Sequence, residues 1–448
     1  MYQRIKKELI EFMTYFLKIM KSSLFLIIDY IAVGIYIIIL TLIANKFSLD
    51  DLTYFNAALA LLYFSNMISY GITSGLNIYI NQNINNKEMI KKYISLGFSI
   101  SLLAGSIFTF IIFISREFIF KNIMSLNITD NYLFFELMCF AIILNVIVEY
   151  FIDIFKLVKE FKYRLISNSI KSFFILILIS ALVYLFTRNI YLIAITYIIA
   201  YAIIIPVMLY LFKYKTKTIN ISFKEIFNCI HNIHKNEVYT VLIVGLKEII
   251  WNIGYTISGI ILLNKSESLY NSYSYFENVL DIINGVFYSL IAVSAMEVCN
   301  QIGENKTQKA YKSSVYSIGI GVIVWLFMFL IYIVFTNNII SGMNTEIQDI
   351  GRNIAILYLF VQLLRYIDWS LNSYILVLGS KVKLPFLLDL FTLVYFTVIF
   401  IFNKYLPNNE YILILIVGSD SIIKNIINIP YFLSKKWIKN VNEDNYVE

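Results

Sequence analysis

The feature that most constrains this chain is a series of apolar stretches of about 20 residues, the length a helix needs to cross a bilayer. Twelve membrane-spanning helices are predicted, at residues 24–44, 54–80, 93–115, 132–155, 169–187, 190–212, 238–263, 270–298, 314–336, 351–378, 386–402 and 411–433. The composition agrees, because 59% of the residues are hydrophobic and only 15% are charged, which soluble domains do not reach. We therefore expect an all-α integral membrane protein.

The polar loops test this count, because cytoplasmic loops are enriched in Lys and Arg. Loops after the even-numbered spans hold 17 Lys and Arg residues, whereas loops after the odd-numbered spans hold 6. Both termini are therefore predicted to be cytoplasmic, and we expect a multi-pass protein of the cell membrane. The net charge of +7 follows from this orientation, so it predicts contact with membrane lipids and no nucleic-acid partner.

The two halves of the chain carry related sequences. NQNINNK at the end of span 2 is repeated as NQIGENK at the end of span 8, and Pro206 of span 6 corresponds to Pro430 of span 12. With six spans each, both halves begin on the same side, which predicts two parallel six-helix repeats around a central cavity. The predicted parts are an N-lobe at 1–212, a cytoplasmic linker with an amphipathic helix at 213–236, a C-lobe at 237–433 and a cytoplasmic tail at 434–448.

One acidic residue lies deep within a predicted span. Asp368 is about 15 Å from the end of span 10 marked by Lys381 and Lys383, at ~1.5 Å per residue, which places it near the middle of the membrane. A carboxylate there is costly without a partner, so it indicates a functional site. A shift of 219 residues relates the two halves and places Glu149 at the corresponding position of the first half.

Spans 7, 8 and 10 place acids and amides on one face of each helix. The predicted cation-coupling and substrate-binding residues are Asp368, Asp281, Glu277, Glu248, Asn252 and Asn372. Oxygen ligands of this kind suit a dehydrated Na⁺ or a shared proton. Asp29 and Glu149 are the corresponding candidates in the N-lobe.

These charges also permit a structural interpretation, in which they only neutralise one another. Arg365 is spaced to pair with Asp368 at i+3, and Lys247 is available to an acid of a neighbouring helix. Asp420 and Lys424 have the i,i+4 spacing of an ion pair within one helix.

Two segments carry a resemblance to a known family. Residues 299–310, CNQIGENKTQKA, are similar to the Q-x-x-G segment and basic stretch after the eighth helix of multidrug and toxic-compound extrusion (MATE) transporters. Asp368, followed by Leu378-Gly379 and Pro385, resembles the helix-10 aspartate of that family. The family belongs to the multidrug/oligosaccharidyl-lipid/polysaccharide (MOP) exporter superfamily.

The chain also departs from the family pattern. The helix-1 aspartate of the family would fall at Leu40 or Thr41, whereas Asp29 lies about three turns nearer the cytoplasm. The helix-7 glutamate of one branch aligns closer to Tyr255 than to Glu248. The resemblance therefore carries a direct functional assignment only to Asp368.

The resemblance implies a secondary antiporter that exports organic cations in exchange for Na⁺ or H⁺, by rocking of its two lobes. The alternative is a flippase of lipid-linked oligosaccharide or polysaccharide precursors, whose anionic cargo calls for Lys and Arg, yet near the middle of the spans acids outnumber bases by 8 to 4. A membrane enzyme is a third class, but no HExxH, GxSxG or Walker A motif supports it. We expect a monomer with no cofactor, small cationic amphipathic substrates, and no metal beyond a transported Na⁺ at Asp368 and Asp281.

Overall fold

The computed structural model describes residues 2–44, 49–118, 132–185, 191–214, 235–343, 345–376 and 382–439. These residues form twelve long helices and no β-strand. Eleven helices of the described parts are long and apolar enough to cross a membrane. Helix α2 (Leu49–Gln82), at the second predicted span, is not among the eleven. The chain is an all-α, multi-pass membrane protein, as the apolar stretches predict.

The chain divides into two compact units. The N-terminal unit comprises Ile28–Gly245, and the C-terminal unit comprises Met1–Ile27 together with Leu246–Glu448. Residues 1–27, which the sequence placed in the N-lobe, therefore cluster with the C-terminal half. The physical reason is the length of α1 (Tyr2–Ala44), whose 43 residues span about 64 Å, twice the hydrocarbon thickness. The linker predicted at 213–236 lies outside the described part of the chain, except for residues 213–214 and 235–236, which belong to the helices on either side.

The first 27 residues bind the C-terminal unit through specific side chains. Tyr15 shares a hydrogen bond of 2.5 Å with Ser294, and Lys18 Nζ lies 2.7 Å from Glu297 Oε1. Both partners lie on α9 (Glu267–Gly303). Helix α1 therefore contributes its beginning to one unit and its remainder to the other.

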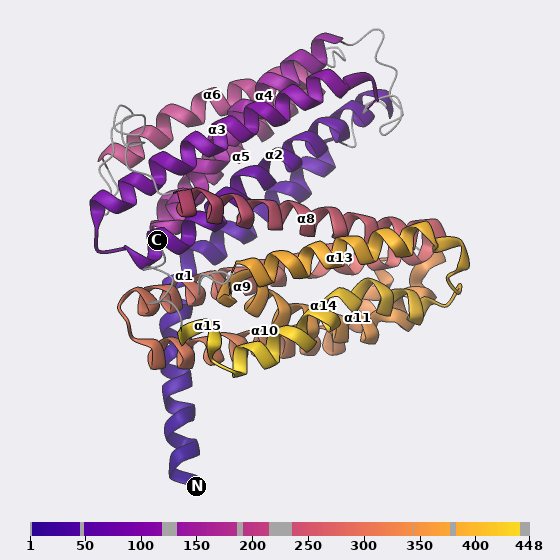
Figure 1. Ribbon diagram of the computed structural model, residues 1–448. Coiled ribbons are helices and arrows are strands. Elements are labelled where there is room, and N and C mark those ends of the chain that lie inside the picture. Colours follow the sequence, from indigo (N-terminus) through magenta and orange to yellow (C-terminus); the bar gives the residue numbers. More distant parts are fainter. Residues whose placement is uncertain are drawn as a thin grey trace. The chain divides into compact units, whose positions relative to one another are not determined.

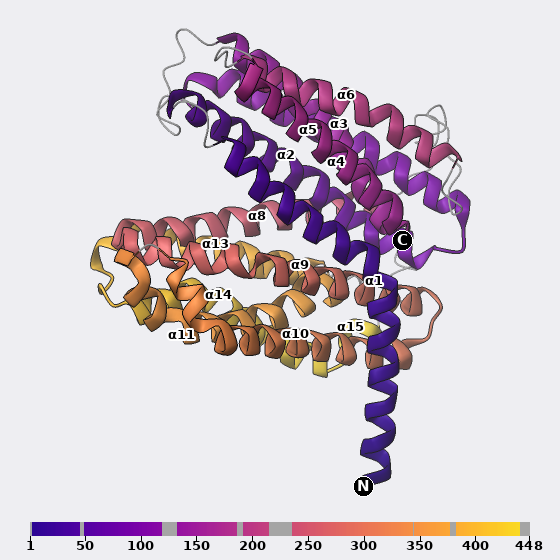
Figure 2. The same cartoon turned by 180° about the vertical axis from the view of Figure 1, so that it is seen from behind.

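The helices of the N-terminal unit pack around one central member, α4. Besides α2 and the later part of α1, they are α3 (Lys87–Phe118), α4 (Tyr132–Leu157), α5 (Phe161–Leu185), α6 (Tyr191–Tyr214) and the beginning of α8 (Lys235–Lys265). Helix α4 contacts α2, α3, α5 and α6, and α2 also packs against α3 (Figures 1 and 2).

The C-terminal unit repeats most of this arrangement around α11. Besides α9 and the rest of α8, its elements are α10 (Thr307–Ser341), η2 (Thr345–Ile347), α11 (Gln348–Asp368), η3 (Trp369–Ile375), α13 (Lys383–Ile401), η4 (Asn403–Tyr405), α14 (Glu410–Leu433) and α15 (Lys436–Lys439). Helix α11 contacts α9, α10 and α14, just as α4 contacts α2, α3 and α6. Equivalent helices thus have equivalent neighbours, which is the packing that two six-helix repeats predict.

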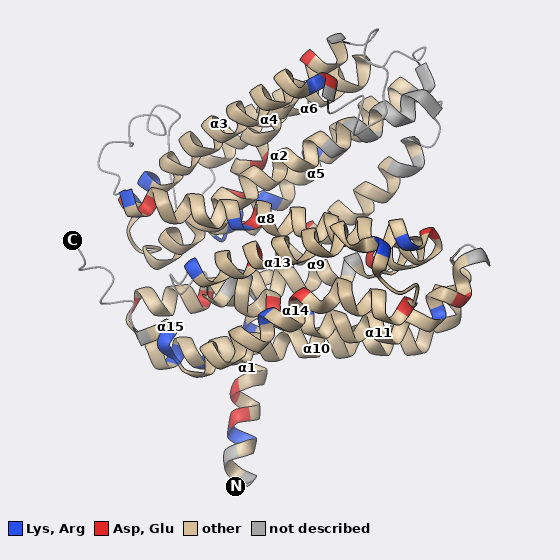
Figure 3. Cartoon of the chain, turned by 45° about the vertical axis from the view of Figure 1, so that its right-hand side comes forward, with Lys and Arg blue, Asp and Glu red and all other residues tan. Residues whose placement is uncertain are grey.

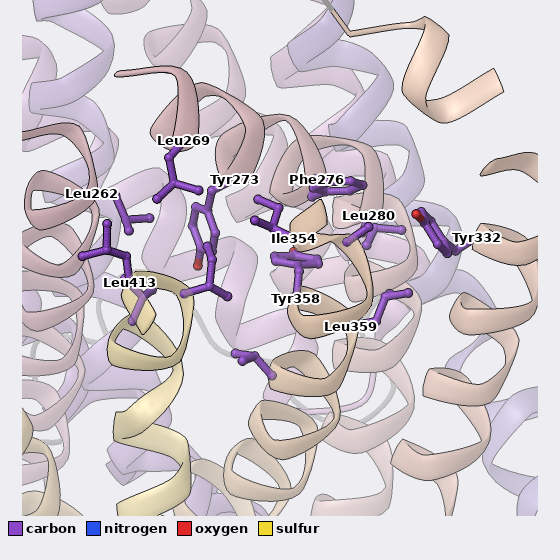
Figure 4. Close-up of a cluster of buried hydrophobic side chains, with 14 of the residues drawn as sticks. Leu262, Leu269, Tyr273, Phe276, Leu280, Tyr332, Ile354, Tyr358, Leu359 and Leu413 are labelled. Atoms are coloured by element: carbon purple, nitrogen blue, oxygen red, sulfur yellow. The ribbon is translucent and has the colours of Figure 1, made fainter. Parts of the chain in front are cut away.

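An apolar core holds α9 and α11 together. Phe276 stacks on Tyr358 with ring centroids 5.4 Å apart, and Tyr273 meets Tyr358 edge-on at 5.6 Å (Figure 4). Ile354 and Leu413 complete this part of the core and are fully or almost fully buried. The core fixes the faces of α9 and α11 that carry polar residues further along each helix.

Helix α11 does not continue as a regular α-helix beyond Asp368. The seven residues of η3, Trp369–Ile375, form a π-helix, and the N–H of Leu376 donates to the carbonyl of Leu371 five residues back. Such wider turns inside helices occur frequently at functional sites. The turn rotates Asn372 relative to the regular helix that its spacing from Asp368 suggests.

Candidate functional site

A cluster of charges, all buried except the partly exposed Asp420, joins four helices of the C-terminal unit. Its members, which we call the lysine–carboxylate cluster, are Lys247 and Glu248 of α8, Asp368 of α11, Asp389 of α13, and Asp420 and Lys424 of α14. Lys424 Nζ lies 2.6 Å from Asp389 Oδ1 and 3.9 Å from Asp420 Oδ2. Lys247 Nζ lies 2.9 Å from Glu248 Oε1 and 3.5 Å from Asp389 Oδ2.

The cluster contains more acid than base. Four carboxylates accompany two ammonium groups, so its formal charge is −2 when all six side chains are ionised. Figure 3 shows a ribbon that is mostly tan, with both basic and acidic residues inside the helices near the label α14. An excess of negative charge in a desolvated place favours binding of a cation or a proton.

Asp368 is the least compensated acid of the cluster. Its side chain is 1% exposed, and its Oδ1 accepts one long hydrogen bond, 3.5 Å from Asn428 Nδ2. Lys424 attracts it electrostatically, but within the described ranges no Lys or Arg forms an ion pair with it. Its negative charge is therefore costly unless a mobile cation or a proton balances it.

Arg365 does not pair with Asp368, contrary to the structural interpretation of the sequence. Its Nη1 donates to Glu277 Oε1 at 2.8 Å and its Nη2 donates to Tyr273 Oη at 2.8 Å. Glu277 also accepts from Tyr255 at 2.9 Å and from Tyr358 at 3.1 Å. The spacing i+3 permits a contact with Asp368, but the tyrosine hydroxyls and Glu277 draw the guanidinium towards α9.

The predicted amides do not face a common ligand. Asn372 Nδ2 donates to Asp389 Oδ1 at 3.3 Å, whereas its Oδ1 is buried and forms no hydrogen bond. Asn252 Nδ2 donates to the carbonyl of Glu248 in its own helix at 2.8 Å. Asp281 lies on α9, but its side chain is outside the described part of the structure. Asn372 therefore joins the cluster through Asp389, whereas the hydrogen bond of Asn252 stays within its own helix.

The acids of the N-terminal unit have close basic partners. Asp29 is 1% exposed and accepts from Arg164 Nε at 2.8 Å and from Asn168 Nδ2 at 2.9 Å. The same guanidinium donates to Asp153 Oδ1 at 2.6 Å. Glu149 forms an ion pair with Lys171. Both N-lobe candidates thus have resident cationic partners.

Asp389 bridges Lys247 and Lys424, but the sequence did not suggest a role for it. Its signals are present in the sequence, since it lies within a predicted span one turn after Pro385. What the sequence lacks is a spacing that relates it to Lys247 and Lys424, because these three residues come from separate helices. Within the described ranges, no group of three or more His, Cys, Asp and Glu converges as a metal site.

Comparison with known proteins relates this chain to transporters through its fold. No protein-family model and no curated protein matches the sequence. A solved structure of MATE in the straight conformation has a TM-score of 0.79 at 13% identity, covering 94% of this chain and 96% of its own. An outward-facing multidrug resistance MATE transporter of the MOP superfamily has a TM-score of 0.77 at 13% identity, covering 93% and 96%.

A third solved structure comes from another member of the superfamily. It is a MOP superfamily transporter from Pyrococcus furiosus, in which the reverse polarity of the binding pocket suggests a different function. It has a TM-score of 0.75 at 12% identity and covers 93% of this chain and 96% of its own. All three matches extend over nearly the whole of both chains. This membrane protein therefore has the fold of the MATE transporters of the MOP superfamily.

Proposed function

We propose that the protein is a secondary antiporter of the cell membrane, with cytoplasmic termini, that exports small organic cations in exchange for H⁺ or Na⁺. Coupled exchange by alternating access requires a charged side chain whose bound ion or proton differs between the inward-open and outward-open states. Asp368 is the proposed coupling residue, and Asp389 and Asp420 of the same cluster add to the negative charge there. The proposed transporter acts as a monomer.

The observation that carries this proposal is the uncompensated charge of Asp368 within an acid-rich cluster. Every other acid of the lysine–carboxylate cluster lies within 4.0 Å of a lysine nitrogen. Glu248 is 2.9 Å from Lys247 Nζ, and Lys424 Nζ is 2.6 Å from Asp389 and 3.9 Å from Asp420. Desolvated carboxylates of this kind are rare in membranes and are typical of ion and proton pathways.

The main competing function is a flippase for lipid-linked glycans on the same fold. Its pyrophosphate-bearing cargo requires exposed Lys or Arg at the binding surface. Lys247 and Lys424 are 1% and 0% exposed and are already bound to carboxylates, so they favour a role in neutralising acids. This contrast supports the antiporter over the flippase.

Reconstitution of the purified chain into proteoliposomes tests the proposal. A cationic dye should move out of the vesicles when a proton or Na⁺ gradient of the correct direction is imposed, and should stop when the gradient is dissipated. Asp368→Asn is the matched inactive control. Transfer of a fluorescent polyprenyl-pyrophosphate glycan without gradient-driven dye movement would assign the flippase function instead.

A further inference from the structure

The lysine–carboxylate cluster already contains cations that belong to the chain. Each carboxylate oxygen of Asp389 faces a different ammonium group, with Lys424 Nζ at 2.6 Å from Oδ1 and Lys247 Nζ at 3.5 Å from Oδ2. Lys424 and Asp389 are both fully enclosed by the protein, since their side chains are 0% exposed. Water therefore contributes little to the screening of either charge.

Lys424 is attracted by three carboxylates at once. Asp389 and Asp420 are its ion-pair partners, and Asp368 attracts it from a greater distance. These acids come from α13, α14 and α11, so the ammonium group lies among three helices. Lys247 of α8 is the other base of the cluster and repels it weakly.

We propose that Lys424 is a specificity-determining residue, whose ammonium group serves as the resident cation among Asp368, Asp389 and Asp420 and excludes alkali cations from them. A Na⁺ that approached these oxygens would meet a fixed positive charge at close range in a place of low dielectric constant. The acids would still attract it, but their charge is already shared with Lys424 and Lys247. If the protein is the proposed antiporter, it follows that a Na⁺ gradient does not drive the exchange. This consequence rests on the proposed function.

Na⁺ binding to the purified, full-length protein tests this inference directly. Binding of ²²Na⁺ is measured together with the thermal unfolding midpoint in NaCl against choline chloride at equal concentration. The wild type should bind no ²²Na⁺ and should unfold at the same temperature in both salts. Lys424→Met removes the charge while keeping a similar volume, and should gain saturable ²²Na⁺ binding that the wild type lacks, with a midpoint that rises in NaCl.

Two further variants keep the test decisive. Lys424→Gln with Asp389→Asn preserves the net charge of the cluster, so it should fold even where Lys424→Met does not, and it should also gain Na⁺ binding. Lys171→Met removes a partly buried ammonium group from the single carboxylate Glu149 in the other unit. This control should lower the midpoint equally in both salts, because one carboxylate is too few for a Na⁺ site.

Two results would overturn the inference: ²²Na⁺ binding by the wild type that Asp368→Asn removes, or no gain of Na⁺ binding in the double variant. Neither result alone would contradict the antiporter, which fails only if no ion gradient moves the dye. Conversely, a wild type without dye transport but with the predicted Na⁺ exclusion would preserve the role of Lys424.

Discussion

The two units carry buried acids on equivalent helices but neutralise them differently. In the N-terminal unit, Arg164 bridges Asp29 and Asp153, and Lys171 binds Glu149. In the C-terminal unit, Asp368 corresponds to Glu149 by the repeat, yet no lysine or arginine of the described residues pairs with it. The N-terminal unit therefore pairs Asp29, Asp153 and Glu149 with its own bases, whereas the C-terminal unit keeps a charge that an external ion can balance.

The source of the bases differs too. In the N-terminal unit, α5 supplies both Arg164 and Lys171. The corresponding fifth helix of the C-terminal unit, α13, supplies the acid Asp389, and the bases come from α8 and α14. The fifth helix of the N-terminal half thus contributes basic side chains to the buried ion pairs, whereas the fifth helix of the C-terminal half contributes an acidic one. A repeat that conserves helix packing has not conserved the charges inside it.

The largest expected effect is the loss of the arginine that balances the N-terminal unit. Arg164→Gln leaves Asp29 and Asp153 buried without their cation, so it should destabilise the protein by ~3–5 kcal/mol. Thermal unfolding in detergent, followed by fluorescence-detected size exclusion, measures this loss. Adding Asp29→Asn and Asp153→Asn should restore most of the stability. A single variant as stable as the wild type would show that the bridge is not structural.

A smaller effect is expected at the ion pair of Glu277 and Arg365 in the C-terminal unit. Glu277 is 22% exposed, so water compensates part of the loss in Glu277→Gln, and we expect ~1.5–3 kcal/mol. The double variant with Arg365→Gln should recover part of this loss, which a double-mutant cycle measures. Arg365→Gln should not rescue Asp368→Asn, because Arg365 contacts Glu277 and not Asp368. Rescue would restore the pair that the sequence spacing suggested.

Close helix contacts provide a third comparison between the units. In the N-terminal unit, a Cβ added to Gly71 would lie 2.8 Å from the Cα of Gly245, where α2 meets α8. In the C-terminal unit, a Cβ added to Gly351 would lie 2.6 Å from the terminal methyl of Met343, which can rotate away. Gly71→Ala should therefore cost ~1–3 kcal/mol, because backbone must move.

Gly351→Ala is the control for this contact and should cost less than ~1 kcal/mol, since a methionine adapts readily. The thermal unfolding midpoints of Gly71→Ala and Gly351→Ala, measured under the same conditions, test this difference. Equal losses would mean that the approach of α2 to α8 is looser than the structure shows.

The sequence predicts most of the fold because its signals are local. Apolar stretches of sufficient length predict the helices, and the repeated Pro206 and Pro430 both lie inside the equivalent helices α6 and α14. The π-helix after Asp368 escaped prediction, because its residues are ordinary helix formers and the widening depends on tertiary packing. The assignment of residues 1–27 to the C-terminal unit escaped for a similar reason, since it depends on Tyr15 and Lys18 meeting α9.

The site was predicted less completely, because ion pairs join residues far apart in the chain. Asp29 meets Arg164 across 135 residues, and Arg365 meets Glu277 across 88 residues. No periodicity encodes such pairings. Spacing within one helix suggested Asp420 with Lys424, which do lie 3.9 Å apart, but Lys424 lies closer to Asp389 of another helix.

We infer that Asp368, and not its counterpart Glu149, couples ions to transport. Asp368→Asn should change stability by less than ~1 kcal/mol, because its carboxylate has no close basic partner to lose. Glu149→Gln should lower stability by ~1–3 kcal/mol, because it leaves the ammonium group of Lys171 without its acid. Gradient-driven efflux of a cationic dye, measured on both folded variants in proteoliposomes, is the most direct test. We expect Asp368→Asn to abolish efflux and Glu149→Gln to retain it. Gradient-driven efflux by Asp368→Asn, or equal loss in a folded Glu149→Gln, would contradict it.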